Sequence, residues 1–252
     1  MMIVTLENNK KINLSEGIDL SIPLNEGSNN PRAWYVAPPR FEPVRENGWV
    51  GVVKEGGTVN FRNIFFNPHG HGTHTECLGH ITPTVYSINN TIKTFFMEAY
   101  VITIEPKQLL VDGKTDYVVT YDQLLEAVKD ISEIPALIIR TLPNNLDKTI
   151  KNYSDTNPPY IDIAALAIIN KLNVKHLLVD LPSVDKEQDG GTLAFHHGFW
   201  GVPKKPNFER TITEFIYVPE NIPDGAYFMN LQVAPFENDA APSRPVLFKY
   251  LE

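Results

Sequence analysis

Runs of apolar residues alternate with polar segments along the chain, and their spacing predicts both strands and helices. Residues 95–104 are dense in aromatic and β-branched side chains, which predicts a strand ended by Glu105 and Pro106. In residues 121–131 apolar positions recur every three or four residues, which predicts a helix with Thr120 as its N-cap. These two periodicities indicate a mixed α/β fold.

A strand, a helix and a second strand follow one another in the middle of the chain. Residues 136–140 and 176–180 are continuous apolar runs, and the helical pattern of residues 160–172 lies between them. Two strands joined in this way pair in parallel, through a right-handed connection. The polar residues 181–192 then follow the second strand, at the sheet edge where α/β proteins commonly keep their sites.

Shorter apolar runs predict strands on either side of this unit. Residues 18–24 contain Pro23, which confines that run to a sheet edge or ends it. The β-rich residues 49–53 and 58–66 are separated by Lys-Glu-Gly-Gly, which is a hairpin signal. Two more strands are predicted at residues 226–235 and 245–251.

Residues 25–47 are rich in Pro, Asn, Gly and Arg, and predict a long ordered loop. Loops of this length in compact domains are often functional. The aromatic residues Trp34, Tyr35 and Phe41 would either wall a substrate pocket or only pin the loop by ordinary packing.

Composition and charge narrow the class of protein. The 252 residues are 42% hydrophobic, enough for a real core, and no change in composition divides them, so we expect a single domain over residues 1–252. A net charge of -8 without a Lys/Arg cluster argues against nucleic acid and anionic membranes as partners. The sequence predicts no signal peptide, no membrane-spanning helix and no internal disulfide, so a cytoplasmic location is expected.

Four of the seven histidines lie in one stretch of twelve residues, which also contains a glutamate: His69, His71, His74, Glu76 and His80. Gly70 and Gly72 leave too few apolar side chains for a packed strand or helix, so the stretch is interpreted as a loop that folds its side chains around one point. Imidazole and carboxylate are common metal ligands. Cys77 would be a thiolate ligand, a nucleophile or, as we favour, a small buried residue beside the site.

Two later segments offer further ligands. His196 follows the polar loop, and Glu214 lies within the apolar run 212–218, where an acid is costly to bury unless it is paired or bound to a metal. His176 is interpreted as a strand-entry residue and not as a ligand. Three imidazoles and two carboxylates, from His74, Glu76, His80, His196 and Glu214, can hold one open metal or a close pair. An open position activates water for attack on a carbonyl, whereas a closed structural zinc would mostly use cysteines.

Residues 72–80, Gly-Thr-His-Thr-Glu-Cys-Leu-Gly-His, resemble the signature of a metal-dependent cyclase/hydrolase family that includes bacterial kynurenine formamidases and isatin hydrolase. The family pattern is His-x-Gly-Thr-His-x-Asp-x-Pro-x-His. Weaker landmarks of the family occur in the family's order along the chain, at residues 19–24, 179–185, 196, 212–214, 234–235 and 242–246. The resemblance spans nearly the whole chain.

This resemblance implies a compact α/β fold with a mixed, curled sheet packed against helices, of the swivelling β/β/α type. It implies that His74 binds a metal, that Glu76 is a ligand able to bridge two metals, and that His80 is either a ligand or the catalytic base. His196 and Glu214 would complete the shell of a second metal. The family's first histidine falls on Gly70, so His69 or His71 would replace it, with His69 preferred because it closes the preceding strand.

The expected activity is hydrolysis of a non-peptide carbon–nitrogen bond by metal-activated water, with an aryl formamide or cyclic amide as the small-molecule substrate. The alternatives are an ester or lactone hydrolase and a catalytically silent small-molecule binding protein. One or two divalent ions are expected, zinc first, with manganese or iron as alternatives. The family resemblance also implies a homodimer or homotetramer.

Overall fold

The computed structural model describes residues 1–251. Its centre is a mixed sheet in the order β16–β9–β12–β14–β15–β8–β17, and β16 also pairs with β17, so the sheet closes into a ring. Strand β3 adds to β17 beside β8. The bounds are β3 (Ile18–Asp19), β8 (His74–Glu76), β9 (Phe96–Ile104), β12 (Ala136–Thr141), β14 (His176–Val179), β15 (Thr211–Glu214), β16 (Gly225–Val233) and β17 (Ala240–Phe248). The mixed, curled sheet that the family resemblance implies is confirmed.

Strands β9, β12, β14 and β15 are mutually parallel, and the strand–helix–strand prediction is correct. Every residue of β12 and of β14 is buried, because both faces of these strands are covered. Alternate residues of β12 enter different cores: Leu137 and Ile139 pack with the helices, and Ile138 packs within the ring with Leu178 and Met229.

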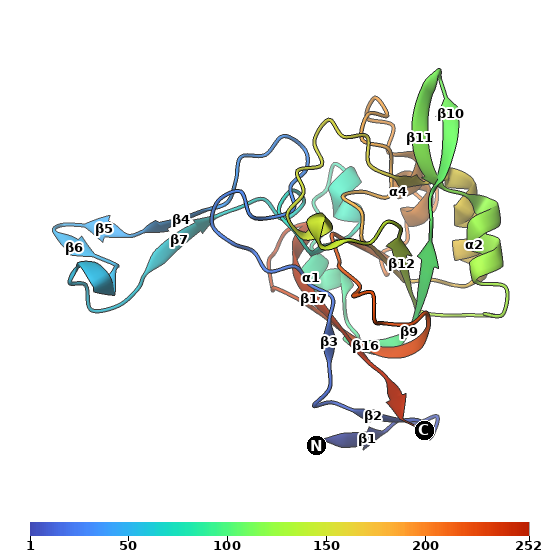
Figure 1. The fold of residues 1–252 in the computed structure, drawn as a ribbon, viewed down its shortest axis with the longest axis horizontal. Coiled ribbons are helices and arrows are strands. Elements are labelled where there is room, and N and C mark those ends of the chain that lie inside the picture. Colours follow the sequence, from blue (N-terminus) through green and yellow to red (C-terminus); the bar gives the residue numbers. More distant parts are fainter. Residues whose placement is uncertain (252) are drawn as a thin grey trace.

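Helices α2, α3 and α4 pack on one face of the sheet, where α2 is seen at the right of Figure 1, whereas Ile88 of α1 joins the core inside the ring. Thr120 and Gln123 form a capping box that starts α2 (Tyr121–Ala127), as predicted, although the helix ends four residues early. The helix expected from residue 160 begins later, because β13 (Tyr160–Ile161) pairs with a strand and Asp162 then caps the following turn. The other helices are α1 (Ile88–Thr91), α3 (Leu166–Lys171) and α4 (Ala194–Trp200).

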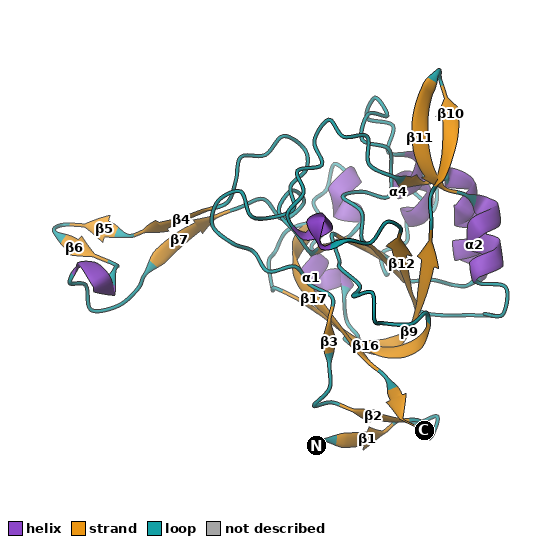
Figure 2. Ribbon diagram, in the orientation of Figure 1, coloured by secondary structure: helices purple, strands orange, loops and turns teal. Residues whose placement is uncertain are grey.

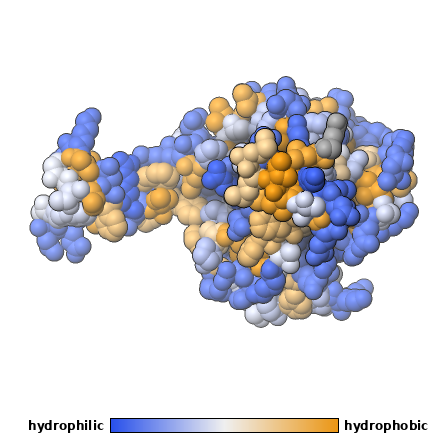
Figure 3. Space-filling view, turned by 90° about the horizontal axis from the view of Figure 1, so that it is seen from below, coloured by the Kyte–Doolittle hydropathy of each residue, from blue (hydrophilic) through white to orange (hydrophobic). Residues whose placement is uncertain are grey.

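A narrow β-arm projects from the body (Figure 1). It is built from β4 (Arg40–Pro43) paired with β7 (Arg62–Phe65), and from β5 (Arg45–Glu46) paired with β6 (Trp49–Val50). The predicted hairpin turn at residues 54–57 is wrong, because the turn lies at Asn47 and Gly48, whose φ angles of 50° and 81° suit a two-residue hairpin. The predicted loop therefore ends at residue 39. Figure 3 shows hydrophobic and hydrophilic residues mixed on the arm's surface.

Two small sheets lie outside the ring (Figure 2). One joins β1 (Ile3–Thr5), β2 (Lys11–Asn13) and β18 (Tyr250–Leu251), so the two ends of the described chain lie side by side. The other joins the hairpin of β10 (Lys107–Val111) and β11 (Lys114–Val119) to β13. Within residues 1–251, no helix is long and apolar enough to cross a membrane.

Candidate metal centre

The ring brings the predicted ligands together through the register of β8 with its neighbours. His74 lies opposite Glu214 of β15, and Glu76 lies two residues further along β8, on the same face. His69 comes from the loop before β8, and His80 from the turn Leu78–Ile81 after it. His196, in α4, approaches the same point from the helical side.

Glu76 is at the centre of the cluster and is 1% exposed. Its Oε1 lies 3.0 Å from His196 Nε2, and its Oε2 lies 3.0 Å from His69 Nδ1 and 3.8 Å from His80 Nε2. Glu214 completes the buried side, with Oε2 3.5 Å from His74 Nε2 and Oε1 3.9 Å from His196 Nε2. The two oxygens of Glu76 therefore face two different groups of imidazoles.

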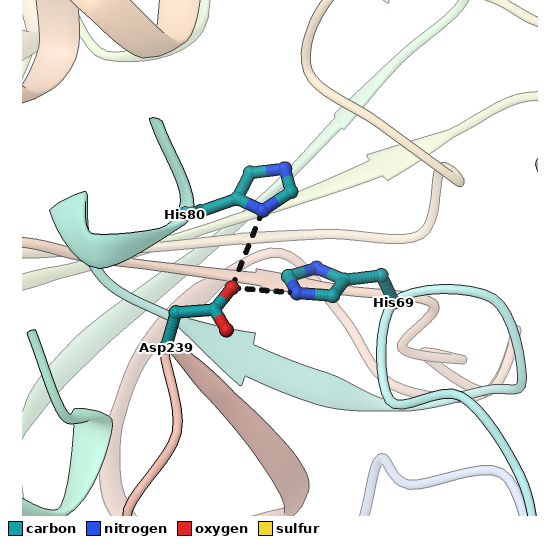
Figure 4. Close-up of side chains that lie close together, drawn as sticks. All are labelled: His69, His80 and Asp239. Atoms are coloured by element: carbon teal, nitrogen blue, oxygen red, sulfur yellow. Dashed lines mark hydrogen bonds and ion pairs between the residues drawn. The ribbon is translucent and has the colours of Figure 1, made fainter. Parts of the chain in front are cut away.

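The second nitrogen of each of these histidines also has an oxygen partner. His74 Nδ1 donates to the carbonyl oxygen of Gly72 at 3.0 Å. His196 Nδ1 lies 2.6 Å from a carboxylate oxygen of Asp185. His69 Nε2 and His80 Nδ1 lie 2.8 Å and 3.3 Å from the same oxygen, Oδ2 of Asp239 (Figure 4). One nitrogen of each ring is thereby left facing Glu76 or Glu214, as is usual for histidines that bind metals.

The structure decides between His69 and His71, the two candidates for the family's first histidine. His71 Nδ1 accepts a hydrogen bond from the backbone N–H of Asn67 at 2.7 Å, and its Nε2 donates to the carbonyl of Ala37 at 2.7 Å. A side chain at Gly70 would meet Val36, since a Cβ there would lie 2.7 Å from Val36 Cγ2. His69 is therefore the histidine of this loop that reaches the cluster.

Two carboxylates of the cluster were missed by the sequence reasoning. Asp185 lies in the polar loop after β14, at the end of the family landmark 179–185, which by itself assigns it no role. Asp239 immediately precedes β17, and its only sequence signal is an acid placed at the start of an apolar strand. That signal is too common to single out a site.

The charges of the cluster perturb one another strongly. Burial raises the pKa of Glu76, but the nearby His80 and the hydrogen bonds from His196 and His69 outweigh it and hold the pKa well below its usual range. Burial lowers the pKa of His69 and His196, but hydrogen bonds with Asp239 and Glu76 for the first, and with Asp185 and Glu76 for the second, raise both to about 10. The carboxylates thus stabilise positive charge at the centre of the cluster.

The donor set fits a divalent cation. His74 Nε2 is buried and, within residues 1–251, has no hydrogen-bond partner, although a carboxylate faces it. His69, His74 and Glu76 each offer a ligand atom within 4.8 Å of the others, and so do Glu76, His80 and His196. Buried, unsatisfied nitrogen beside carboxylate oxygen is the arrangement that a bound cation would complete.

Cys77 takes no part in this donor set. It is fully buried, its thiol donates to the carbonyl of Tyr86 at 3.2 Å, and burial raises its pKa. His176 likewise lies apart, with its Nδ1 2.8 Å from Thr211 Oγ1 at the start of β14, as expected for a strand-entry residue.

A cavity of about 200 Å³ opens over the cluster. Trp34 and Leu193 supply apolar wall, and Lys186 lies at the rim with its ammonium 2.7 Å from Asp116. Of the predicted loop aromatics, Trp34 therefore reaches the pocket, whereas Tyr35 is exposed and donates to Asp155, and Phe41 belongs to the arm. His80, with 31% of its side chain exposed, is the most accessible of the clustered histidines.

Solved structures share this fold over nearly their whole length. One is a potential metal-dependent hydrolase with cyclase activity (TM-score 0.64, 15% identity, covering 94% of this chain and 99% of that one). A "predicted metal-dependent hydrolase" from Bacillus stearothermophilus gives a TM-score of 0.63 with 17% identity, covering 92% of this chain and 98% of that one. An isatin hydrolase bound to the product analogue thioisatinate gives 0.66 with 13% identity, covering 94% and 93%. Identities this low establish the fold alone.

No curated protein sequence matches the chain significantly. The sequence model of the Cyclase family, however, matches residues 18–186, which is more than half of the chain and includes β8 and the histidine loop. The match thus covers the segment that carries His69, His74, Glu76 and His80. On this evidence the chain belongs to the Cyclase family.

Proposed function

We propose that this protein is a metal-dependent hydrolase that cleaves a non-peptide carbon–nitrogen bond in a small molecule, an aryl formamide or a cyclic amide. The observation that carries the proposal is the convergence of four imidazole nitrogens on Glu76 and Glu214 beneath a small cavity. The hydrolases among the solved structures with this fold support the same class of reaction.

The cation would be held by His69, His74 and Glu76, and a second one by Glu76, His196 and Glu214. Glu76 suits a bridging role because its two oxygens face different imidazoles. When bound, a divalent cation supplies Lewis acidity, which polarises a carbonyl oxygen and lowers the pKa of water. Imidazole and carboxylate suit zinc first, with manganese and iron(II) as alternatives.

The protein's own side chains would move the proton and orient the substrate. His80 Nε2 takes a proton from the attacking water as its oxygen bonds to the carbonyl carbon. The same nitrogen then delivers that proton to the leaving nitrogen as the carbon–nitrogen bond breaks. The products are a carboxylic acid and an amine, or one molecule that carries both groups when the amide is cyclic.

The cavity limits the size of the substrate. An engineered cavity of about 150 Å³ accommodates benzene, so about 200 Å³ is room for one ring and a small acyl group. Trp34 and Leu193 present apolar surface to such a ring. The carbonyl would then lie toward Glu76 and His80.

The test combines metal analysis with a substrate screen. Elemental analysis of purified protein should find a divalent metal, and a screen of formylated anilines, cyclic imides and lactones should find turnover of a carbon–nitrogen bond. His74→Ala and Glu76→Ala should lose both metal and turnover, whereas the exposed-surface variant Lys129→Ala should keep both. Full metal content in His74→Ala would contradict the metal site.

Two outcomes of the screen would replace the proposed activity. Faster turnover of an ester than of its matched amide would make the protein an ester or lactone hydrolase. Tight binding without turnover across all three substrate classes would make it a binding protein that has kept the metal site.

A further inference from the structure

We propose that Asp239 is a positioning residue that sets the tautomers of two histidines at once, the metal ligand His69 and the proton carrier His80. The inference rests on the proposed function, since it assigns Asp239 a role inside that site. It is carried by the way one carboxylate oxygen meets two stacked rings.

The two rings lie one over the other beside the carboxylate (Figure 4). Their centroids are 4.2 Å apart and their planes are inclined by 25°. Asp239 Oδ2 lies 2.8 Å from His69 Nε2 and 3.3 Å from His80 Nδ1. A single oxygen therefore faces one nitrogen of each ring.

Asp239 is held there by the backbone of the ring. Ala240, the next residue, pairs with Glu76 across β17 and β8. The backbone N–H of Cys77 donates to the carbonyl of Asp239 at 3.0 Å, and that of Ile88 donates to the carbonyl of Asn238 at 2.8 Å. The carboxylate is only 16% exposed, so it approaches the two histidines from a fixed position.

A carboxylate can only accept hydrogen bonds, so each nitrogen that faces it must carry a hydrogen. When a cation takes the place of the proton between His69 Nδ1 and Glu76 Oε2, which lie 3.0 Å apart, the one remaining hydrogen of His69 is on Nε2, and the lone pair of Nδ1 is available to the metal. His80 is protonated at Nδ1, and its Nε2 keeps the lone pair that accepts a proton from water. The hydrogen bond at one imidazole nitrogen decides the state of the other.

The other histidines of the site are fixed one at a time. Asp185, which also accepts the backbone N–H of Phe195, contacts His196 and no other clustered histidine, and His74 uses the carbonyl of Gly72. Of the clustered histidines, removing Asp185 should therefore affect His196 alone. Removing Asp239 should weaken a ligand and disturb the proton carrier together, which gives the two variants different signatures.

The tautomers can be read directly from long-range ¹H–¹⁵N spectra of zinc-loaded protein labelled at histidine, with signals assigned through His69→Gln and His80→Gln. The expected wild-type result is His69 protonated at Nε2 and His80 protonated at Nδ1. Finding His80 protonated at Nε2 would overturn the inference without any variant at Asp239.

Variants give a second, independent measurement. Asp239→Ala should shift the His80 signals toward a mixture of tautomers, lower zinc affinity in chelator competition by about tenfold or more, and lower kcat with little change in KM. Asp185→Ala should lower zinc affinity but leave the His80 signals in place. Unchanged His80 signals and zinc affinity in Asp239→Ala would overturn the inference. Asp239→Asn, which keeps the size of the side chain, serves if the alanine variant does not fold.

Failure of this inference is distinguishable from failure of the proposed function. If His74→Ala keeps its zinc, the metal site itself is wrong. If His74→Ala loses zinc while Asp239→Ala keeps both its affinity and its tautomers, only the role of Asp239 is wrong.

Discussion

Glu214 lies directly opposite His74 in the antiparallel pair of β15 and β8, with its Oε2 3.5 Å from His74 Nε2. The geometry is not that of a hydrogen bond, and in the described part of the chain the nitrogen has no other partner. A buried imidazole and a buried carboxylate that lie side by side without a hydrogen bond suit ligation of neighbouring cations. The register of two short strands thus creates a pair of ligands from residues far apart in the sequence.

The charge of Glu214 should be needed for metal binding. Glu214→Gln keeps an oxygen for the backbone N–H of Val184, which donates to Glu214 Oε1 at 3.1 Å, but removes the negative charge. We expect zinc affinity in chelator competition to fall by about tenfold or more. Glu209→Gln, at an exposed pair with Lys175, is the control and should keep wild-type affinity. Equal affinities in the two variants would exclude Glu214 as a ligand.

Substitutions at His69 and His71 should have different effects, the first on metal content and the second on stability. His69→Ala removes a nitrogen 3.0 Å from Glu76 and should lower bound metal and turnover. His71→Ala removes hydrogen bonds to the backbone at Asn67 and Ala37, so it should lower the free energy of unfolding by about 1–3 kcal/mol and keep the metal. Elemental analysis and urea unfolding measure the two effects. Loss of metal in His71→Ala alone would reverse the assignment.

The buried pair of Lys148 and Asp180 should be important for stability. Lys148 Nζ lies 2.7 Å from the fully buried carboxylate of Asp180, which also accepts hydrogen bonds from Thr141. Lys148→Met keeps the aliphatic stem but leaves the carboxylate without its cation, and should lower the free energy of unfolding by about 3–5 kcal/mol. Lys129→Met breaks a pair of equal length whose side chains are 59% and 73% exposed. It should change stability by less than about 1 kcal/mol, and a similar loss in both variants would contradict this account.

His176 should make the protein less stable in mild acid. Burial, with a smaller effect from Lys175, lowers its pKa from 6.5 to about 4. Between these values the unfolded chain binds a proton that the folded protein does not, so stability present above pH 6.5 is lost as the pH falls toward 4. The free energy of unfolding of the wild type, relative to His176→Gln, should drop by about 2 kcal/mol between pH 7.5 and pH 5. A difference independent of pH would show that His176 does not titrate in this way.

The sequence predicted the parts of the site that carry an unusual residue in a recognisable setting. Glu214 was identifiable because an acid interrupts an apolar run, and His74 and Glu76 because they lie in a dense histidine motif. Their convergence depends on β8 lying between β15 and β17, a pairing that no local pattern encodes. The resemblance to a known family, and not periodicity, supplied that expectation.

The misses have physical causes too. Asp239 enters the site only through the pairing of Ala240 with Glu76, so nothing in its neighbours along the chain marks it. The hairpin turn of the arm was predicted at the wrong place for a different reason. The prediction rests on Lys-Glu-Gly-Gly, although the Asn-Gly pair at Asn47 and Gly48 is the stronger hairpin signal. The Gly56 that suggested the turn instead ends a short 3-10 turn, with φ of 91°.

The closure of the ring by β16 and β17 also has a consequence for the order of events during translation. His69 leaves the ribosome early, but its partner Asp239 is made 170 residues later, and the strand β17 that borders β8 follows it. A nascent chain lacking β17 would have the histidine loop without the neighbour that positions it. Capture of the cation should therefore follow synthesis of β17.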